Sequence, residues 1–400
     1  MLLNLTATLQ GWSAQTTRLS NDTLFATESH SNRFELIRNQ SNGEPEMKAA
    51  VYYGPGDIRI EERPEPTATN DNLIAKIHCC AICGTDLKLA TIGNPRCHPP
   101  RIIGHEMVGT VLHVGADVDG FSVGERITLA TTVACGSCHI CGLGLGNLCP
   151  NAMPISYDFD GAFAETISIP PDAIQRGNVI NVPDSVSNEA AALSEPFSCA
   201  INAQELVELK PGDSVLIIGG GPLGAIHAEL ARANNVKKVM LVQRSEPRLS
   251  MLRRIEGLIV IDGSREDVAS IVSKHTSELG ADVVIVCAPN RKAQEDCLKY
   301  VRKGGAISLF ASLPKGASEI TIDSRLLHYG ELRLVGASDS RPEHVKKAVQ
   351  MMESKRISPE RLITHRIDLK DLSEGLELMK RKACLKVLIY PSGVSDETGS

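Results

Sequence analysis

Apolar and polar residues follow an alternating strand and helix pattern through the second half of the chain. From Asp213 onward, short apolar runs that fit buried strands are separated by helical patterns. The strand-like runs cover residues 215–218, 239–242, 258–261, 283–286, 306–310 and 332–335, and a helical pattern covers 223–233. This alternation is typical of a doubly wound parallel sheet, so we expect a Rossmann-type α/β domain over residues 189–339.

The preceding region, residues 47–188, has a different pattern. Gly and Pro interrupt it often, β-rich runs such as 107–114 recur, and no long amphipathic helix is present, which predicts a β-rich domain. After the α/β region, the patterns predict helices over 342–356 and 372–381 and a last strand over 385–390. We expect residues 340–392 to return to the β-rich domain. Residues 1–46 are rich in Ser, Thr and Asn without an apolar period, and we expect a disordered extension there.

Composition narrows the class of protein. The chain has 400 residues, 42% hydrophobic and 22% charged, which is enough for two globular domains. A net charge of −6 gives no basic field for nucleic acid, and no apolar run is long enough to cross a membrane, so we expect neither partner. The twelve cysteines lack disulfide-framework spacing, which favours a reducing compartment, and we expect a cytoplasmic protein.

Four cysteines, Cys135, Cys138, Cys141 and Cys149, form a compact C-x2-C-x2-C-x7-C motif. Four thiolates can enclose one tetrahedral zinc and leave no position for water or substrate, so this site is predicted to be structural. An iron–sulfur cluster is the nearest alternative, but bacterial ferredoxins place the fourth cysteine after three residues rather than seven. Accidental clustering and disulfides are the remaining interpretations.

A glycine-rich turn follows the first apolar run of the α/β region. Gly219, Gly221 and Gly224, with Pro222 and Leu223 between the last two, form G-x-G-x-x-G where a strand meets a helix. Such glycines permit a tight turn, close approach of a pyrophosphate and close helix packing. The motif predicts a dinucleotide site, and the alternative is a turn with surplus glycines.

The end of the second α/β strand reads Gln243-Arg244-Ser245, where NAD-binding folds usually carry Asp or Glu. Without a carboxylate to repel a 2′-phosphate, and with a guanidinium and a hydroxyl beside it, this end favours NADP. The alternative is that Arg244 is a solvated surface residue and Gln243 binds the ribose of NAD.

A second set of metal-ligating residue types is dispersed along the chain. A single Cys, a His and carboxylates can make an open zinc site that keeps one position for substrate. These residues occur as Cys83-Gly-Thr85-Asp86, His105-Glu106 and Glu195. With the cysteine motif and the glycine turn in the same order, residues 47–391 resemble the zinc-dependent medium-chain alcohol and polyol dehydrogenases, a family with a GroES-like catalytic domain and a Rossmann domain.

The resemblance implies roles for particular residues. Cys83, His105, Glu106 and Glu195 would contact a catalytic zinc directly or through water, giving two zincs per chain with the structural site. Asp86 would orient His105, and Thr85 would take the proton of a small-molecule alcohol that is oxidised to a ketone. The family also implies a homodimer or homotetramer joined through edge strands of the dinucleotide sheets, and residues 306–311 and 332–335 are candidates.

This chain departs from the family pattern at two places. Lys88 stands where relatives often carry a relay histidine, and residues 336–340 replace the Arg-Tyr pair that sorbitol dehydrogenases present to the polyol. The substrate is therefore left open among polyols, their phosphates, amino alcohols and simple secondary alcohols. A metal-free quinone reductase, a non-catalytic protein on this fold and a zinc-finger-like nucleic-acid module are the alternatives from other classes.

Overall fold

The computed structural model of this chain describes residues 45–394. The predicted disordered extension, residues 1–46, therefore lies almost wholly outside the described residues. Within 45–394, no helix is both long and apolar enough to cross a membrane.

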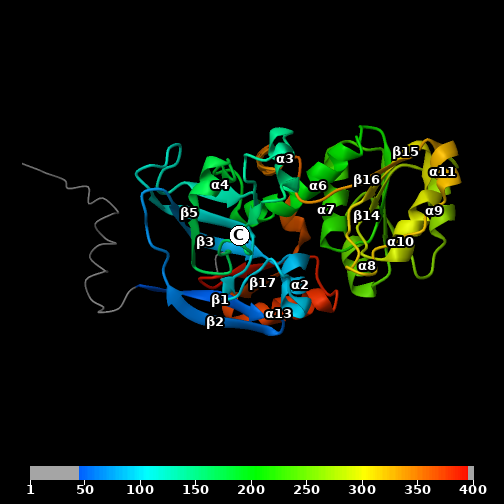
Figure 1. Cartoon of the computed structure of the whole chain (residues 1–400). Helices are drawn as coiled ribbons and strands as arrows, with labels where there is room; N and C mark the ends of the chain where they lie inside the picture. Colours follow the sequence, from blue (N-terminus) through cyan, green and yellow to red (C-terminus); the bar gives the residue numbers. More distant parts are fainter. Residues whose placement is uncertain (1–44, 395–400) are drawn as a thin grey trace, which may run out of the picture. The chain divides into compact units, whose positions relative to one another are not determined.

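The β-rich region is built on a seven-stranded sheet in the order β10-β6-β5-β3-β18-β17, with β9 also paired to β3 (Figure 1). Its strands are β3 (Leu73–Ala81), β5 (Glu106–Val114), β6 (Arg126–Leu129), β9 (Thr166–Ile169), β10 (Val179–Asn181), β17 (Ile363–Asp368) and β18 (Lys386–Tyr390). Two smaller sheets join β1 (Glu46–Gly54) to β2 (Asp57–Pro64) and β4 (Arg101–Ile102), and β7 (Thr132–Val133) to β8 (Met153–Pro154). The helices of this region are short: α2 (Gly84–Ile92), α3 (His139–Gly142), η2 (Gly146–Leu148) and α4 (Pro171–Gln175).

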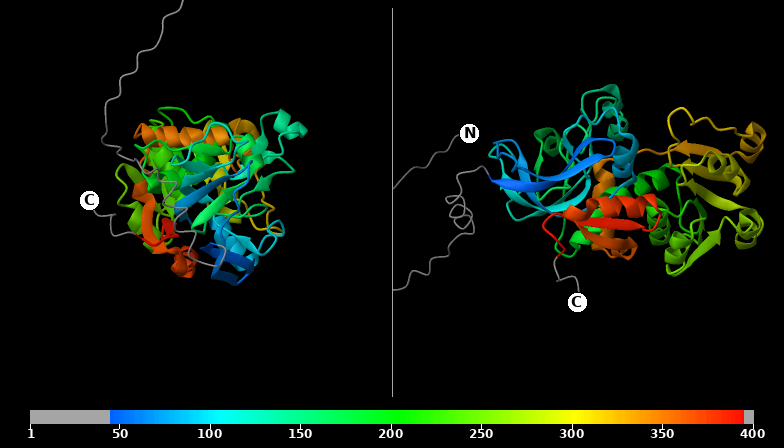
Figure 2. Two further views of the ribbon diagram at one scale, coloured as in Figure 1. Left: turned by 90° about the vertical axis from the view of Figure 1, so that its left-hand side faces the viewer. Right: turned by 90° about the horizontal axis from the view of Figure 1, so that it is seen from below.

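The end of the chain returns to this sheet. The predicted last strand is β18, which pairs antiparallel with β3 so that Leu388 lies opposite Ala81, and pairs parallel with β17. Figure 2 shows the red C-terminal segment beside the blue and cyan strands. The returning segment contains α12 (Pro342–Glu353), η4 (Pro359–Leu362), β17, η5 (Leu369–Asp371), α13 (Leu372–Lys380) and β18. Strands that are more than three hundred residues apart in sequence are therefore neighbours in space.

The α/β region contains a six-stranded parallel sheet in the order β13-β12-β11-β14-β15-β16. Every predicted apolar run forms a strand: β11 (Ser214–Ile218), β12 (Lys238–Gln243), β13 (Leu258–Asp262), β14 (Ala281–Val286), β15 (Val301–Leu309) and β16 (Arg333–Gly336). The helices of this region are α5 (Asn188–Ala192), α6 (Ser194–Leu206), α7 (Pro222–Ala233), α8 (Glu246–Leu252), α9 (Val268–His275), α10 (Arg291–Asp296), η3 (Cys297–Lys299) and α11 (Ser324–Gly330). The predicted fold class is confirmed.

One expectation about the sheet edge is wrong. Residues 306–309 belong to β15, which pairs with β14 on one side and β16 on the other, so this run is not an edge. β16 is an edge strand of the parallel sheet. The apolar run was misleading because a central strand and an edge strand can share the same composition.

Burial on both faces explains why β11 reads as a continuous apolar run. Val215 and Ile217 pack into one apolar core, while Leu216 and Ile218 pack into the core on the other face. Successive side chains of a strand point to opposite sides, so a strand covered on both faces needs apolar residues at every position. The first core also contains Cys79 of β3, which places the two regions on shared apolar packing.

Candidate active site

The register between β3 and β5 brings the predicted catalytic metal ligands together. Ala81 pairs with Glu106, so the chain that continues from β3 to Cys83 runs beside His105. One donor atom each from Cys83, His105 and Glu106 lies within 4.8 Å of the other two. These three residues offer sulfur, nitrogen and oxygen ligands, a set that suits zinc.

A glycine fixes the approach of the histidine. Gly104 has a φ of 94°, and a Cβ there would lie 2.6 Å from the ring of Phe163. The left-handed backbone and the close aromatic contact both require glycine at this position. The residue is therefore needed for the turn that delivers His105 to the start of β5.

Asp86 lies behind this group. One carboxylate oxygen accepts a hydrogen bond of 2.8 Å from the backbone N–H of Cys83, and the other lies 3.7 Å from Nδ1 of His105. Burial raises the pKa of Asp86, and the neighbouring His105 opposes that shift. The Oδ1 atom is buried without a hydrogen-bond partner. The arrangement suits a carboxylate that steadies a ligand histidine.

Sequence reasoning missed a buried lysine at this site. Nζ of Lys386, in β18, forms an ion pair with the Glu106 carboxylate and donates a hydrogen bond of 3.0 Å to the carbonyl of Ile82. Burial alone would lower the pKa of Lys386, but the charges of Glu106, Cys83 and Glu195 and the hydrogen bond to Glu106 together outweigh it, and the pKa is raised. A single lysine within the apolar run 385–390 was the only signal in the sequence.

Glu195 belongs to a second group of donor atoms. It lies in the first turn of α6, and its carboxylate is within 4.8 Å of donor atoms of Cys199 and Asp339. Burial raises the pKa of Glu195 to about 7, and the charges of Glu106 and Asp339 add to this effect. Sequence reasoning predicted Glu195 but not its neighbour Asp339.

The site carries an excess of acidic groups that a cation would offset. Asp86, Glu106 and Glu195 are buried together, with Lys386 and the imidazole of His105 as the nearby basic groups. Buried carboxylates without compensating charge are costly, and a divalent cation reduces that cost. The donor atoms of Cys83, His105 and Glu106 thus fit a metal ion. Thr85 is half-buried beside these groups in α2, whereas Lys88 is exposed.

The four-cysteine motif forms a compact sulfur cage. The Sγ atoms of Cys135 and Cys149 are 3.4 Å apart, as are those of Cys138 and Cys141, and two further pairs are 3.8 and 3.9 Å apart. A tetrahedral zinc with bonds of about 2.3 Å would separate its sulfur ligands by about 3.8 Å. Backbone amides, first that of Ser137, lower the pKa of Cys135 to about 6. The cage therefore fits a closed zinc site.

Two glycines of the predicted dinucleotide turn have a steric reason, and the third leaves the helix start open. Gly219 has a φ of 108°, and a Cβ on Gly224 would lie 1.9 Å from the carbonyl oxygen of Gly219. Gly221 caps the N-terminus of α7, followed by Pro222 and Leu223. A Cβ on Gly221 would meet, within 4 Å, only the guanidinium of Arg248. The amides at this helix start are thus open to an anion, as a pyrophosphate site requires.

The side chain of Gln243 is already used by its own turn. Its Oε1 accepts hydrogen bonds from the backbone N–H groups of Arg244, at 2.7 Å, and Ser245, at 3.5 Å. An oxygen engaged in this way is less available to ribose hydroxyls. Arg244 is exposed and its stem passes Gly263. Sequence reasoning missed Arg248, which donates to the carbonyl of Cys384 at 3.2 Å and lies beside the glycine turn.

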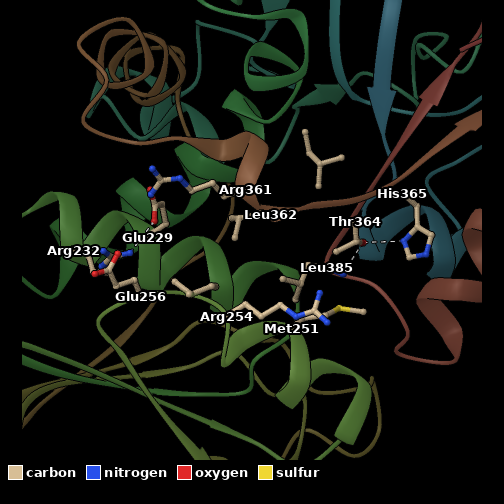
Figure 3. Close-up of a pocket in the computed structure, with 12 residues that line it drawn as sticks. Glu229, Arg232, Met251, Arg254, Glu256, Arg361, Leu362, Thr364, His365 and Leu385 are labelled. Carbon is tan, nitrogen blue, oxygen red and sulfur yellow. Dashed lines mark hydrogen bonds and ion pairs between the residues drawn. The ribbon is translucent and has the colours of Figure 1, made fainter. Parts of the chain in front are cut away.

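A cavity of about 700 Å³ lies apart from these residues (Figure 3). Its walls come from the ends of α7 and α8 and from η4 and β17, and include Arg232, Arg254, Arg361 and His365. None of the predicted metal or cofactor residues lines it. The cavity is therefore not part of the predicted catalytic site.

Comparisons with known proteins agree with this chemistry. Residues 69–184 match the alcohol dehydrogenase GroES-like domain, and residues 222–354 match the zinc-binding dehydrogenase domain. Sorbitol dehydrogenase of Bacillus subtilis is 32% identical over 355 residues, which is 86% of this chain and 98% of the relative. L-threonine 3-dehydrogenase of Caldanaerobacter subterraneus is 30% identical over 339 residues, which is 83% of this chain and 95% of the relative.

Solved structures are also similar. A zinc-binding dehydrogenase from Sinorhizobium meliloti, bound to NADP, has a TM-score of 0.80 at 28% identity and covers 87% of this chain and 100% of its own. Alcohol dehydrogenase TADH from Thermus sp. ATN1 has a TM-score of 0.79 at 27% identity, covering 86% and 99%. The resemblance predicted from the sequence is confirmed: the chain belongs to the zinc-binding dehydrogenase family and is an NAD(P)-dependent alcohol dehydrogenase.

Proposed function

We propose that this enzyme interconverts a secondary alcohol of the polyol class and its ketone, with NADP preferred over NAD. The observation that supports this most is the grouping of Cys83, His105 and Glu106 within 4.8 Å of one another. Relatives named as sorbitol and D-arabinitol dehydrogenases, at 32% and 28% identity, support the substrate class. A threonine-like amino alcohol is the second candidate, supported by a relative at 30% identity.

In the proposed site, Cys83, His105 and Glu106 hold zinc, and Glu195 lies next to the position left for substrate. When bound, zinc supplies Lewis-acid chemistry that lowers the pKa of an alcohol. Asp86 orients His105, and Lys386 balances the charge of Glu106. Cys135, Cys138, Cys141 and Cys149 hold the structural zinc and order their loop.

Proton and hydride leave the substrate by different routes. The hydroxyl of Thr85, which is half-buried, takes the alcohol proton and gives its own proton to solvent water, because a hydroxyl both accepts and donates. Hydride transfer from the carbinol carbon to the nicotinamide is the chemistry of the cofactor. The chain contributes the turn at Gly219, Gly221 and Gly224, whose amides bind the pyrophosphate. Lys88, which is exposed, replaces the outer relay histidine of relatives.

The choice of NADP rests on the end of β12. Gln243 carries no charge, and its Oε1 bonds to the backbone amides of the turn. Arg244 and Ser245 supply a cation and a hydroxyl next to where a 2′-phosphate would lie. The similar structure with bound NADP supports this choice. Arg248 serves the pyrophosphate side of either cofactor.

The proposal also covers the oligomeric state, the compartment and the domain limits of the enzyme. We infer a homodimer or homotetramer that joins through β16, because this strand is at the sheet edge and Tyr329 just before it is 62% exposed. All twelve cysteines lie in the described part of the chain and each is free, which supports a reducing, cytoplasmic compartment. We retain 47–188, 189–339 and 340–392 as the proposed domain limits.

A substrate panel tests the proposed function. Zinc-replete protein would be given NADP+ or NAD+ with sorbitol, arabinitol, a sugar alcohol phosphate, threonine and isopropanol, and nicotinamide reduction would be followed. We expect turnover of a polyol with NADP+ preferred. Absence of turnover on every alcohol, with two zincs bound per chain, would contradict the proposal.

A further inference from the structure

The loop between β16 and α12 carries an acidic residue toward the proposed metal site. The side-chain oxygen of Asp339 lies within 4.8 Å of a carboxylate oxygen of Glu195 and of the sulfur of Cys199. This is the stretch, residues 336–340, in which the chain lacks the Arg-Tyr pair of sorbitol dehydrogenases.

Several contacts hold Asp339 in this position. Its carboxylate accepts hydrogen bonds from the hydroxyl of Thr132 and, at 2.7 Å, from the backbone N–H of Ser340. Its carbonyl accepts a hydrogen bond of 2.8 Å from Asn202 in α6. The backbone at Asp339 is left-handed, with a φ of 57°. Such a conformation is uncommon for a residue other than glycine and persists where surrounding contacts fix it.

The loop that carries Asp339 forms hydrogen bonds with two neighbouring elements, the cysteine loop and α6. Asn147, between two cysteines of the sulfur cage, donates a hydrogen bond of 2.9 Å to the carbonyl of Ser338. The hydroxyls of Ser340 and Ser198 are 2.6 Å apart and buried. The carboxylate is therefore held by the cysteine loop on one side and by α6, which carries Glu195, on the other. A group held in this way is preorganised for recognition.

We propose that Asp339 is a specificity-determining residue that accepts a hydrogen bond from a donor group on the carbon next to the reacting carbinol. This inference rests on the proposed function and names its substrate more closely. An ionised carboxylate has about four acceptor sites, and the two hydrogen bonds from Thr132 and Ser340 leave others open. The class recognised is an alcohol with an adjacent hydroxyl or ammonium group. A substrate with a phosphate at that end is disfavoured, because two negative charges repel.

The test measures selectivity rather than activity alone. Sorbitol, threonine, sorbitol phosphate and isopropanol would be compared in wild type, Asp339→Asn and Thr132→Val, with Asp184→Asn as an exposed control. Binding of sorbitol and of threonine to the zinc-loaded enzyme with NADPH would be measured by calorimetry, and zinc content would be determined for each variant. The sorbitol and threonine arms distinguish a hydroxyl donor from an ammonium donor.

We expect Asp339→Asn to lower kcat/KM for sorbitol or threonine about tenfold more than for isopropanol, mainly through KM, and to weaken sorbitol or threonine binding. Discrimination against sorbitol phosphate should decrease. Thr132→Val, which removes one hydrogen bond to the carboxylate, should shift selectivity in the same direction by less. An equal loss on all four alcohols in both variants would mean that Asp339 only holds the loop, and would overturn the inference. If wild type oxidises no alcohol, the proposed function itself fails.

Discussion

Lys386 and Glu106 form an ion pair in which the side chains are 2% and 1% exposed. The two residues are 280 positions apart and meet because β18 pairs with β3, while β3 pairs with β5. The end of the chain therefore supplies the counter-charge of a proposed metal ligand. Folding of the C-terminal strand and assembly of the active site are coupled through this contact.

Replacing the lysine should cost stability. In Lys386→Met the carboxylate of Glu106 would remain buried without its partner, and the loss of one partner of a buried pair costs about 3–5 kcal/mol. Urea unfolding of the zinc-free protein would measure the change. The double variant Lys386→Met with Glu106→Gln is the control, since it removes both charges.

We expect the double variant to recover most of the lost stability and to bind zinc at the catalytic site more weakly than wild type. Equal unfolding free energies for Lys386→Met and wild type would show that the pair makes no net contribution. Zinc content after dialysis reports on the ligand role of Glu106 separately from folding.

The two zinc sites should respond differently to cysteine replacement. Cys83→Ser should abolish alcohol oxidation, leave cofactor binding intact and reduce zinc from two to one per chain. Cys135→Ser should also lose one zinc, but mainly impair folding or assembly, because its cage orders a loop. Elemental analysis and thermal unfolding would be compared with turnover. Wild-type activity in Cys83→Ser would contradict the assignment of the catalytic site.

Replacing one or the other of the two arginines near the dinucleotide turn should have different effects on the binding of NADP and NAD. Arg244→Ala should raise KM for NADP by about 10- to 100-fold and change KM for NAD little, since a charge-assisted phosphate contact is lost. Arg248→Ala should weaken both cofactors, because Arg248 lies beside Gly221. Steady-state kinetics with each cofactor would measure this. An unchanged NADP preference in Arg244→Ala would place the 2′-phosphate contact elsewhere.

A buried histidine should make the protein sensitive to acid. His227 is fully buried, its Nε2 has no partner, and burial lowers its pKa to about 3. The folded state therefore binds this proton less readily than the unfolded state, whose histidine has a pKa of about 6.5. Stability from this group is complete above pH 6.5 and declines as pH falls toward 3, by about 2 kcal/mol at pH 5.

The measurement is urea unfolding at pH 7.5 and pH 5. His227→Gln should lose less stability between the two values than wild type does, by about 2 kcal/mol. His98→Gln, at an exposed position, serves as the control. If wild type and His227→Gln lose the same amount, protonation of His227 does not contribute.

The fold was predictable because strands buried on both faces require continuous apolar runs. Residues 215–218 illustrate this, since each side of β11 faces its own core. The glycine turn was predictable because the left-handed backbone of Gly219 and the close approach of Gly224 to Gly219 are local. Contacts that depend on the pairing of strands far apart in the sequence could not be predicted. Lys386 lies in an apolar run and reads as a surface residue until β18 is placed beside β3.

The substrate side of the site was only partly predictable. The sequence indicated that residues 336–340 depart from the family pattern, but not which of them lies near the proposed metal ligand Glu195. Asp339 reaches Glu195 because its loop is fixed by Thr132 and Asn202, two contacts that depend on the tertiary structure. The position of Arg248 likewise depends on how α8 packs beside the turn.

The most direct test of the account follows zinc and alcohol oxidation together. Wild type and Cys83→Ser would be prepared with measured zinc content, and NADP+ reduction by the best polyol would be recorded before and after zinc removal and return. We predict that wild type carries two zincs, loses its activity with one of them and regains it on zinc addition, while Cys83→Ser stays inactive. Full activity in wild type without zinc, or in Cys83→Ser, would contradict oxidation at a zinc site made by Cys83, His105 and Glu106.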